Sequence, residues 1–438
     1  MYLGNVIFLI VFVISITFFT KNLMKIISNI KLGKDINRTN NKRKRFLKMI
    51  RIALGQTKMF DRPIAAFFHL IIYVGFIIIN IEVVEIIIDG VFGTHRFLSN
   101  FISYSSYNFF ISTFEFLAVL VLISCVVFLW RRNIQRIKRF HSPEMTSWPK
   151  SDANLILIFE VLLMSAFLVM NAADTLLQSL DSHYHEVGAF TFSSFLVPLI
   201  DHFSVEKLIL IERFCWWFHI IGILLFLNYV LISKHLHIFF AFFSAYYSKI
   251  SSPSKLSNLS SVTSEVKMML DPNIDPFTNT NNNTSAEKFG AQDADDLNWV
   301  QILNSYSCTE CGRCTSVCPA NITGKKLSPR KILMDTRDRI TEIGNSISKK
   351  KNKDEKFLLG GYIQPEEIWA CTTCNACGDA CPIELDPMSI IIDLRRYLVM
   401  EKSSAPSELN TMFNNIENNG APWQYNLNDK LNWINEDK

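Results

Sequence analysis

Eight of the ten cysteines fall into two motifs of identical spacing. Each motif reads Cys-x2-Cys-x2-Cys-x3-Cys-Pro, the ligand spacing of bacterial domains that hold two 4Fe–4S clusters. In such domains three closely spaced thiolates wrap one cluster, and the fourth reaches the other cluster. The chemistry that these groups supply is one-electron transfer. The spacing assigns four cysteines to each predicted cluster: Cys308, Cys311, Cys314 and Cys381 to the first, and Cys371, Cys374, Cys377 and Cys318 to the second.

Zinc sites and disulfides are the two alternatives for these cysteines. Zinc also binds paired Cys-x2-Cys elements, but each ion needs four ligands of its own and not a four-cysteine run that ends in proline. Disulfides are disfavoured because the charge pattern described below places this part of the chain in the reducing cytoplasm. The motifs therefore favour two 4Fe–4S clusters.

The stretch between the motifs, residues 319–370, is longer than in a compact bacterial ferredoxin. Ser328 is expected to cap a helix, Pro329 to occupy its first turn and Gly344 to follow its last turn. Apolar residues recur at helical spacing within this predicted helix. A further helix is expected over residues 387–400. The domain around the clusters is therefore predicted to be helical.

Histidines in apolar segments offer a second kind of metal ligand. His69 lies about 9 Å into one such segment, at about 1.5 Å per residue, and His237 lies at the end of another. Neutral imidazole is a standard axial ligand, and two imidazoles close both faces of a haem iron. His69 and His237 are expected at similar depth, which makes them candidate ligands of haem b. The alternative is a hydrogen bond to a neighbouring helix.

His219 is the candidate ligand of a second haem, but it has no evident partner on its own side. The spacing from His219 to His237 equals about five turns of about 3.6 residues, so on one continuous helix both would share a face. His235 would then lie on a different face. One helix would thus present two imidazoles at two membrane depths.

The composition indicates which elements must position these ligands. The chain has 438 residues, of which 49% are hydrophobic and 19% are charged, whereas soluble domains carry about 25% charged residues. These values exclude an ordinary soluble enzyme and a disordered chain. The net charge of +4 gives no reason to expect a nucleic-acid partner.

Five apolar segments approach the length of about 20 residues that a membrane helix requires. They cover residues 3–20, 64–88, 109–130, 153–173 and 208–232. The predicted fold class is all-α, with a five-helix transmembrane bundle followed by an α-helical ferredoxin domain. Composition rich in Ser, Asn, Thr, Asp and Pro indicates a linker between the two. The predicted parts are a transmembrane domain (1–248), a polar linker (249–294), a dicluster domain (295–405) and a C-terminal tail (406–438).

Basic residues alternate between the loops. The loops at residues 21–62 and 131–150 are rich in Lys and Arg, whereas 90–108 carries only Arg96 and 176–206 carries none. Because cytoplasmic loops hold the excess of basic residues, the N-terminus is expected outside and the cysteine motifs in the cytoplasm. The predicted location is the bacterial inner (cytoplasmic) membrane. Glu82 and Glu85 then lie near the outer end of their span.

Two apolar segments resemble the cytochrome b subunits of the respiratory nitrate reductase gamma and heterodisulfide reductase E type. They are DRPIAAFFHLIIYVGF (61–76) and WWFHIIGILLFLNYVLISKHLHIFFAF (216–242). The cysteine-rich part resembles the heterodisulfide reductase C family, an α-helical ferredoxin domain. The combination, with FGAQDADDLNWVQ leading into SCTECGRC, is similar to membrane-bound Fe–S oxidoreductases of Bacteroidota.

This resemblance implies a cytochrome b-like domain with bis-histidine haem b. His69 and His237 match the haem pair nearer the cytoplasm, and His219 matches one ligand of an outer haem. The usual partner of that ligand falls at Ile79, where this sequence departs from the family's pattern. One haem b is therefore expected, and a second has only half of its ligands.

The chain has predicted electron carriers but no evident site for an organic substrate. In the family that it resembles, heterodisulfide reductase activity lies in domains with a Cys-Cys pair. Neither that dipeptide nor a Gly-rich dinucleotide motif occurs here. A separate catalytic subunit is therefore expected, and the chain would be part of a quinone-linked, heterodisulfide reductase-like oxidoreductase.

Two functions stay open from the sequence. The first is a membrane electron-transfer subunit of a respiratory complex, which passes electrons between a cytoplasmic catalytic partner, two 4Fe–4S clusters, haem b and the quinone pool. Its expected partners are a cytoplasmic redox protein or a Cys-Cys-containing reductase subunit, membrane lipid, and menaquinone or another quinone. The second is a haem-free membrane anchor that acts as a ferredoxin-like relay or docking subunit.

Overall fold

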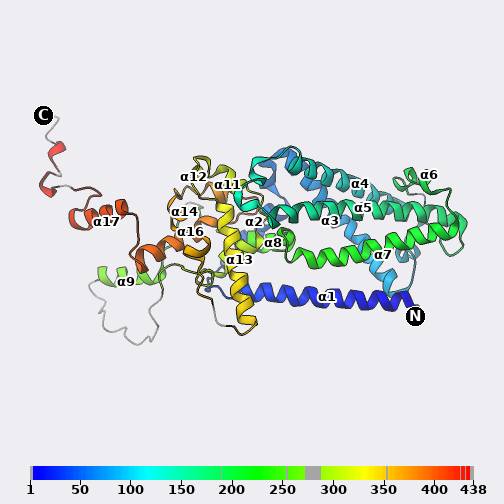
Figure 1. The fold of residues 1–438 in the computed structure, drawn as a ribbon, viewed down its shortest axis with the longest axis horizontal. Coiled ribbons are helices and arrows are strands. Elements are labelled where there is room, and N and C mark those ends of the chain that lie inside the picture. The colour runs from blue at the N-terminus through cyan, green and yellow to red at the C-terminus, as the bar shows by residue number, and fades with distance from the viewer. Residues whose placement is uncertain are drawn as a thin grey trace.

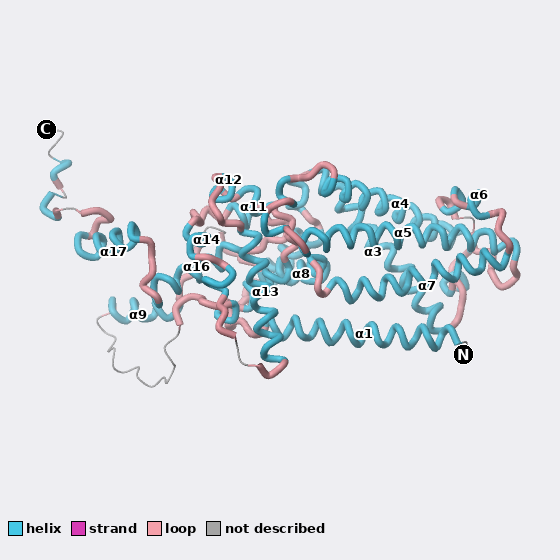
Figure 2. Tube along the Cα trace, in the orientation of Figure 1, coloured by secondary structure: helices cyan, strands magenta, loops and turns pink. Residues whose placement is uncertain are grey.

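The computed structural model describes residues 3–188, 190–252, 255–271, 288–351, 354–424, 426–429 and 431–434. Within these ranges the chain is helical and contains no strand. Figure 1 shows a bundle of long helices that ends at the N-terminus on one side and at a group of short helices on the other. Figure 2 shows that loops connect the helices throughout. The predicted all-α fold class is confirmed.

In the described part of the chain five helices are long and apolar enough to cross a membrane, which is the number of spans that the sequence predicts. The second of them has Pro63 at its first position, where proline is favoured. It ends before Gly93, which adopts a left-handed φ of 74°. The structure extends most helices beyond the predicted apolar segments, because their polar ends keep helical geometry. The five are α1 (Leu3–Ile30), α3 (Pro63–Phe92), α4 (Tyr104–Asn133), α5 (Trp148–Leu180) and α7 (Val205–Val230).

Short helices surround the cysteine motifs in what we call the cysteine region (residues 288–401). They are α10 (Trp299–Ser307), α11 (Arg313–Val317), α12 (Pro319–Ile322), α13 (Pro329–Ser348), α14 (Pro365–Trp369), α15 (Ala376–Asp379) and α16 (Pro387–Arg396). We call the end of the bundle that contacts this region the cysteine end, and the opposite end the far end. The remaining helices are α2 (Lys42–Met49), α6 (Val197–Ile200), α8 (His237–Tyr247), α9 (Ser260–Leu270) and α17 (Ser407–Asn419).

One apolar core joins the cysteine region to the bundle. Ile26 of α1 and Phe240 of α8 are buried in it together with Ile302 of α10, Leu333 of α13 and Leu394 of α16. Burial of such side chains contributes about 1.5–3 kcal/mol each relative to exposure. The cysteine region is therefore packed against the bundle rather than tethered by a linker alone.

The predicted linker contains a helix that the composition did not indicate. Helix α9 (Ser260–Leu270) lies within residues 249–294. Residues 253–254 and 272–287 of that segment, including the polar run at 279–287, lie outside the described residues. The division of the chain into domains therefore stays a prediction.

The prediction that His219 and His237 share one helical face is wrong. Helix α7 ends at Val230, a 3-10 turn follows at Lys234–Leu236, and His237 begins the separate helix α8. The break is stabilised by Ser233, whose side chain accepts a hydrogen bond from the N–H of His235 at 3.1 Å. A capped turn within an apolar run does not change its periodicity, so the sequence alone predicts a continuous helix.

The predicted start of the helix between the motifs is confirmed, and its predicted end is wrong. Ser328 caps α13 and accepts from the N–H of Lys331. The helix then continues through Gly344 to Ser348. Gly344 is required inside the helix because Asn29, near the end of α1, lies directly against it. A Cβ at this position would lie 1.9 Å from the Asn29 side-chain oxygen.

Gly344→Ala is expected to lower the apparent melting temperature of the full chain. Alanine normally stabilises a helix interior relative to glycine, but here it would overpack a contact, which costs about 1–3 kcal/mol. Asn29 cannot simply turn aside, because it is buried and donates to the Tyr306 hydroxyl at 2.9 Å. Gly361→Ala is the matched control, since a Cβ added there would meet no atom within 4 Å. A higher melting temperature for Gly344→Ala would contradict this account.

A buried network of charges occupies the far end of the bundle. Arg96 lies between α3 and the following turn and forms ion pairs with Glu82 at 3.1 Å and Asp174 at 3.0 Å. The same guanidinium donates to Asn171 at 2.6 Å, and Asn171 donates to Glu115 at 3.0 Å. The network therefore ties α3, α4 and α5 together by polar contacts inside an otherwise apolar bundle.

Candidate electron-transfer site

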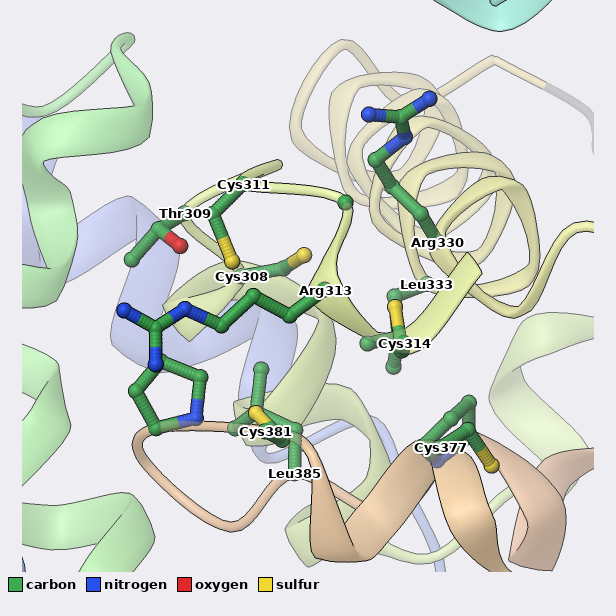
Figure 3. Close-up of a pocket in the computed structure, with 13 residues that line it drawn as sticks. Cys308, Thr309, Cys311, Arg313, Cys314, Arg330, Leu333, Cys377, Cys381 and Leu385 are labelled. Carbon is green, nitrogen blue, oxygen red and sulfur yellow. The ribbon is translucent and has the colours of Figure 1, made fainter. Parts of the chain in front are cut away.

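The eight cysteines of the two motifs line two neighbouring cavities of similar empty volume, 340 and 320 Å³. Cys377 lines both cavities. The other cysteines of the first cavity are the first three of motif one and the last of motif two. Figure 3 shows the sulfur atoms of these four around the cavity, with the Cys377 sulfur pointing away from them. The first cavity is thus lined by Cys308, Cys311, Cys314 and Cys381, and the second by Cys318, Cys371, Cys374 and Cys377.

This grouping has the crossed form that the sequence predicts, with the last cysteine of each motif beside the other motif. The ligand assignment itself stays a prediction. No group of three or more His, Cys, Asp or Glu side chains in the described part of the chain converges on a single metal position. A cubane cluster does not require such convergence, because each thiolate binds a different iron atom.

The two motifs fold in the same way around their first three cysteines. In the first, Glu310 and Gly312 have left-handed φ values of 54° and 70°; in the second, Thr373 and Asn375 have 55° and 59°. These residues turn the chain so that the backbone N–H two residues after the first cysteine points at its sulfur, at 3.4 Å in both copies. Asn tolerates this conformation, whereas position 312 requires glycine because a Cβ would lie 2.4 Å from Arg330 Nη1.

The donor set fits anionic metal clusters. Burial raises the pKa of Cys308 and of Cys377 to about 12, so both thiols hold their protons unless a metal replaces them. Arginine side chains gather beside the first cavity, and a thiolate-bound cluster would supply the negative charge that opposes them. When bound, a 4Fe–4S cluster accepts and releases one electron.

The candidate haem ligands share one structural feature: Nδ1 of each ring lies beside an oxygen acceptor. His237 Nδ1 donates to the Lys234 carbonyl at 3.0 Å, and His219 Nδ1 donates to the Leu163 carbonyl at 3.1 Å. His69 Nδ1 lies 3.0 Å from Oε1 of Gln56. Because a carbonyl can only accept, the ring proton of His219 and of His237 lies on Nδ1, which leaves Nε2 as the metal-binding atom, as metal-ligating histidines generally require.

His69, near the start of α3, and His237, at the start of α8, both lie at the cysteine end of the bundle. His235 is beside them, with its ring centroid 5.7 Å from that of His237. Burial lowers the pKa of His235 well below its ordinary value, and His237, Lys234 and His69 lower it further. This environment favours the neutral form of His235, and neutral imidazole is the form that binds metal. His219 lies apart from them in the middle of α7, where its ring faces Phe167.

The segments that hold these rings also contact the first cysteine motif. Gln56 directly precedes the turn at Thr57–Asp61. Arg313, next to Cys314, donates to the Lys58 carbonyl of that turn at 2.9 Å. The segment beside His69 thereby contacts the loop of the first cysteine motif.

Lys234 makes the second connection between a histidine segment and the motif. Its ammonium group pairs with Glu310 at 2.7 Å, and Arg337 pairs with the same carboxylate at 2.8 Å. Burial would raise the pKa of Glu310, but these two cations outweigh it and hold the pKa below its ordinary value. Asp152 of α5 accepts from the backbone N–H of Lys234 at 3.1 Å. The loop of the first motif is thus fixed to the residues around His237.

Comparison with known proteins agrees with this arrangement. Residues 307–385 match the model of the 4Fe-4S dicluster domain family. The chain's homologues are iron–sulfur oxidoreductases. The chain is 29% identical to a probable iron-sulfur-binding oxidoreductase, FadF, of Bacillus subtilis, over 87% of this chain and 54% of the relative. It is 24% identical to an EtfAB:quinone oxidoreductase of Syntrophomonas wolfei, over 92% and 55%.

Other relatives match the cysteine region or part of the chain. A probable membrane-anchored ferredoxin of Chromohalobacter salexigens is 27% identical over 33% of this chain and 24% of the relative. The C and D components of heterodisulfide reductases are also similar. The chain spans about half the length of the first two relatives. No solved structure matches it. Taken together, the chain combines a 4Fe-4S dicluster domain with helices that are long and apolar enough to cross a membrane.

Several residues of the site could not be found from the sequence. Gln56, Lys234 and Glu310 lie beside the candidate ligands, but a single polar residue in a loop gives no periodic or spacing signal. Lys234 stands in the SKHLH segment that drew attention only for its histidines. The folded chain is needed to show that these residues meet.

Proposed function

We propose that this chain is the membrane electron-transfer subunit of a respiratory oxidoreductase, carrying electrons between a cytoplasmic catalytic partner, two 4Fe–4S clusters, haem b and a membrane quinone. In this proposal the bundle crosses the bacterial inner membrane with the N-terminus outside and the cysteine region in the cytoplasm. The basic loops at residues 21–62 and 131–150 support this orientation, since both lie on the same side as the cysteine motifs.

The observation that carries the proposal is the shared support of the two kinds of ligand. The segment that orients His69 receives a hydrogen bond from Arg313, and the segment that orients His237 pairs with Glu310. Arg313 and Glu310 both lie within the first cysteine motif. Residues that would hold iron in the two environments are therefore fixed to one another within a buried interface.

The chain's own residues have distinct tasks in this proposal. The cysteines bind iron, and the acceptors of the three Nδ1 protons orient the imidazole rings. Lys234, Asp152 and Glu310 are buried at the interface and keep it rigid and dry. Outer-sphere electron transfer needs fixed distances and low solvent reorganisation, which such a preorganised polar contact supplies.

We infer the catalytic partner and the quinone from the relatives of this chain. The aligned part of this chain covers only about half of each of the first two relatives, so an additional part, separate or attached, supplies the organic chemistry in our proposal. The name of the Syntrophomonas relative includes quinone, and we assign a quinone to this chain as the membrane-side partner. A heterodisulfide reductase-like partner is expected from the similarity to the C and D components of those enzymes.

The proposed haem is tested by a pyridine-haemochrome spectrum of the purified full chain. We expect a b-type signal that is lost, by more than nine-tenths, in His69→Ala and in His237→Ala, because each removes one axial ligand. His141→Ala is the matched control, since this exposed histidine lies in a loop. Iron–sulfur absorption should persist in all three variants. A haem signal unchanged by both ligand substitutions would overturn the haem assignment.

The second candidate function is a haem-free membrane anchor for a ferredoxin-like relay. The similarity to a membrane-anchored ferredoxin favours it. The same spectra separate the two functions. Iron–sulfur absorption without any haem signal would support the anchor and exclude the haem-containing subunit.

A further inference from the structure

One arginine that lines the first cavity and two more beside it have no carboxylate partner. They are Arg62, Arg139 and Arg313, and among the described residues none of the three forms an ion pair with Asp or Glu within 4.0 Å. Arg313 instead donates to backbone carbonyls, and Arg62 donates to the Ser316 hydroxyl at 2.8 Å. Asp61 is the carboxylate whose charge acts on Arg313, from beyond ion-pair distance.

Arg139 belongs to a loop of the bundle but faces the cysteine motif. Burial, together with the neighbouring Arg62 and Arg313, lowers its pKa to about 10, whereas Cys311 acts in the opposite direction. Its Nε atom is buried without a hydrogen-bond partner. Like charges that gather at one place repel one another unless an anion lies among them. The nearest candidate for that anion is the cluster bound through Cys311.

The second cavity has no comparable excess of positive charge. Arg395 lies beside Cys371 and donates to the carbonyls of Ile368 and Cys371. Asp386 acts on Cys377 from the other side, and it is itself paired with Lys249 at 2.7 Å. One cation and one carboxylate–lysine pair therefore replace the three unpaired arginines.

The number of cysteines and the backbone hydrogen bond to sulfur are matched between the two sites, and solvent exposure differs. Each has four cysteines and one backbone N–H directed at the first sulfur at 3.4 Å. Cys374 of the second site is exposed, whereas Cys308 is buried. Water at Cys374 stabilises the more negative, reduced form and so raises the potential of the second site. Three positive charges held beside the first cavity, one of them on the buried Arg313, act more strongly than solvent at one edge.

We propose that Arg62, Arg139 and Arg313 give the first site a higher reduction potential than the second, so that electrons run from the exposed Cys374 side toward the bundle. The inference rests on the proposed function, because it requires both clusters. A reduced cluster carries one more negative charge than an oxidised one, and nearby cations stabilise it. In each transfer the second cluster loses one electron and the first gains it, with no bond or proton changed. The electron donor is a reduced cytoplasmic flavoprotein or iron–sulfur protein that docks at Cys374.

The test is an EPR-monitored redox titration of the full chain, with wild type, Arg139→Gln and Arg62→Gln compared. Arg43→Gln is the control, since Arg43 is exposed on α2. We expect two midpoint potentials in the wild type. Both test substitutions should lower the higher potential and leave the lower one in place, and the control should move neither.

The outcomes separate this inference from the proposed function. Absence of any iron–sulfur signal in the wild type would overturn the proposed function itself. The inference would be overturned, and the proposed function left intact, by either of two results. The first is two signals whose midpoint potentials do not change in Arg139→Gln and Arg62→Gln, and the second is a shift confined to the lower potential. A purely structural role for the arginines would change iron content and not potential, so iron is measured in every variant.

Discussion

Cys381→Ser should remove the same cluster as Cys314→Ser, although residue 381 belongs to the second motif. Two 4Fe–4S clusters give about eight irons per chain, and each of these variants should retain about four. The reason is geometric: Cys381 lines the first cavity with Cys308, Cys311 and Cys314. The measurement is iron content together with the EPR spectrum of the reduced full chain. Both variants should lose the same signal and keep the other.

Cys318→Ser and Cys374→Ser form the complementary pair. Cys318 lines the second cavity, beside Cys371 and Cys374, so these two variants should lose the signal that Cys381→Ser retains. Cys125→Ser is the control, because this cysteine lies within α4, away from both motifs. Loss of one shared signal in Cys381→Ser and Cys374→Ser would show that each motif holds its own cluster without crossing. Zinc in place of iron would exclude the clusters altogether.

The sequence indicates the 4Fe-4S dicluster domain because its cysteines follow a local rule of spacing. Spacing alone groups Cys308, Cys311 and Cys314, and the repeated motif implies the exchange of Cys318 and Cys381. The sequence also predicts the five long apolar helices, since an apolar run of about 20 residues forms few structures other than a membrane-spanning helix. Both features depend on short stretches of chain, where composition and spacing carry the information.

Relations between distant segments are what the sequence does not reveal. Gly344 looks like a helix end until Asn29, from α1, is found against it. The turn between Val230 and His237 interrupts an apolar run without any change of periodicity. Arg139 and Arg313 are separate basic residues in the sequence, and only the fold brings them together beside Cys311. Charge, packing and backbone turns of this kind are set by tertiary contacts.

Arg96 illustrates the same point at the far end of the bundle. In the sequence it is the one basic residue of its loop, and Glu82 and Glu85 look free to reach the membrane surface. The structure instead buries all three: the arginine is 6% exposed and both glutamates are 2% exposed. Glu85 accepts from the Tyr107 hydroxyl at 2.9 Å, and Glu82 pairs with Arg96. Arg96 thus pairs with carboxylates from two different helices, Glu82 of α3 and Asp174 of α5.

Arg96→Met should destabilise the full chain by about 3–5 kcal/mol, the usual cost of leaving a buried charge without its partner. The substitution leaves Glu82 and Asp174 facing each other in an apolar bundle, where ionised carboxylates are poorly solvated. The measurement is thermal unfolding in detergent, and we expect a large drop in apparent melting temperature. Arg43→Met, which removes an exposed arginine from α2, should change the melting temperature little.

The double substitution Arg96→Met with Glu82→Gln distinguishes lost charge pairing from lost packing. Neutralising Glu82 removes one of the two carboxylates that Arg96→Met leaves unpaired, so the double variant should recover part of the lost stability. Replacing a whole buried ion pair is far less costly than removing one partner, because no uncompensated charge remains. If the double variant were as unstable as the sum of the two single variants, the arginine would act through its packing against Phe190, whose ring centroid lies 5.2 Å from the guanidinium carbon. Recovery would instead show that balanced charge, and not side-chain volume, holds α3 to α5 at this end of the bundle.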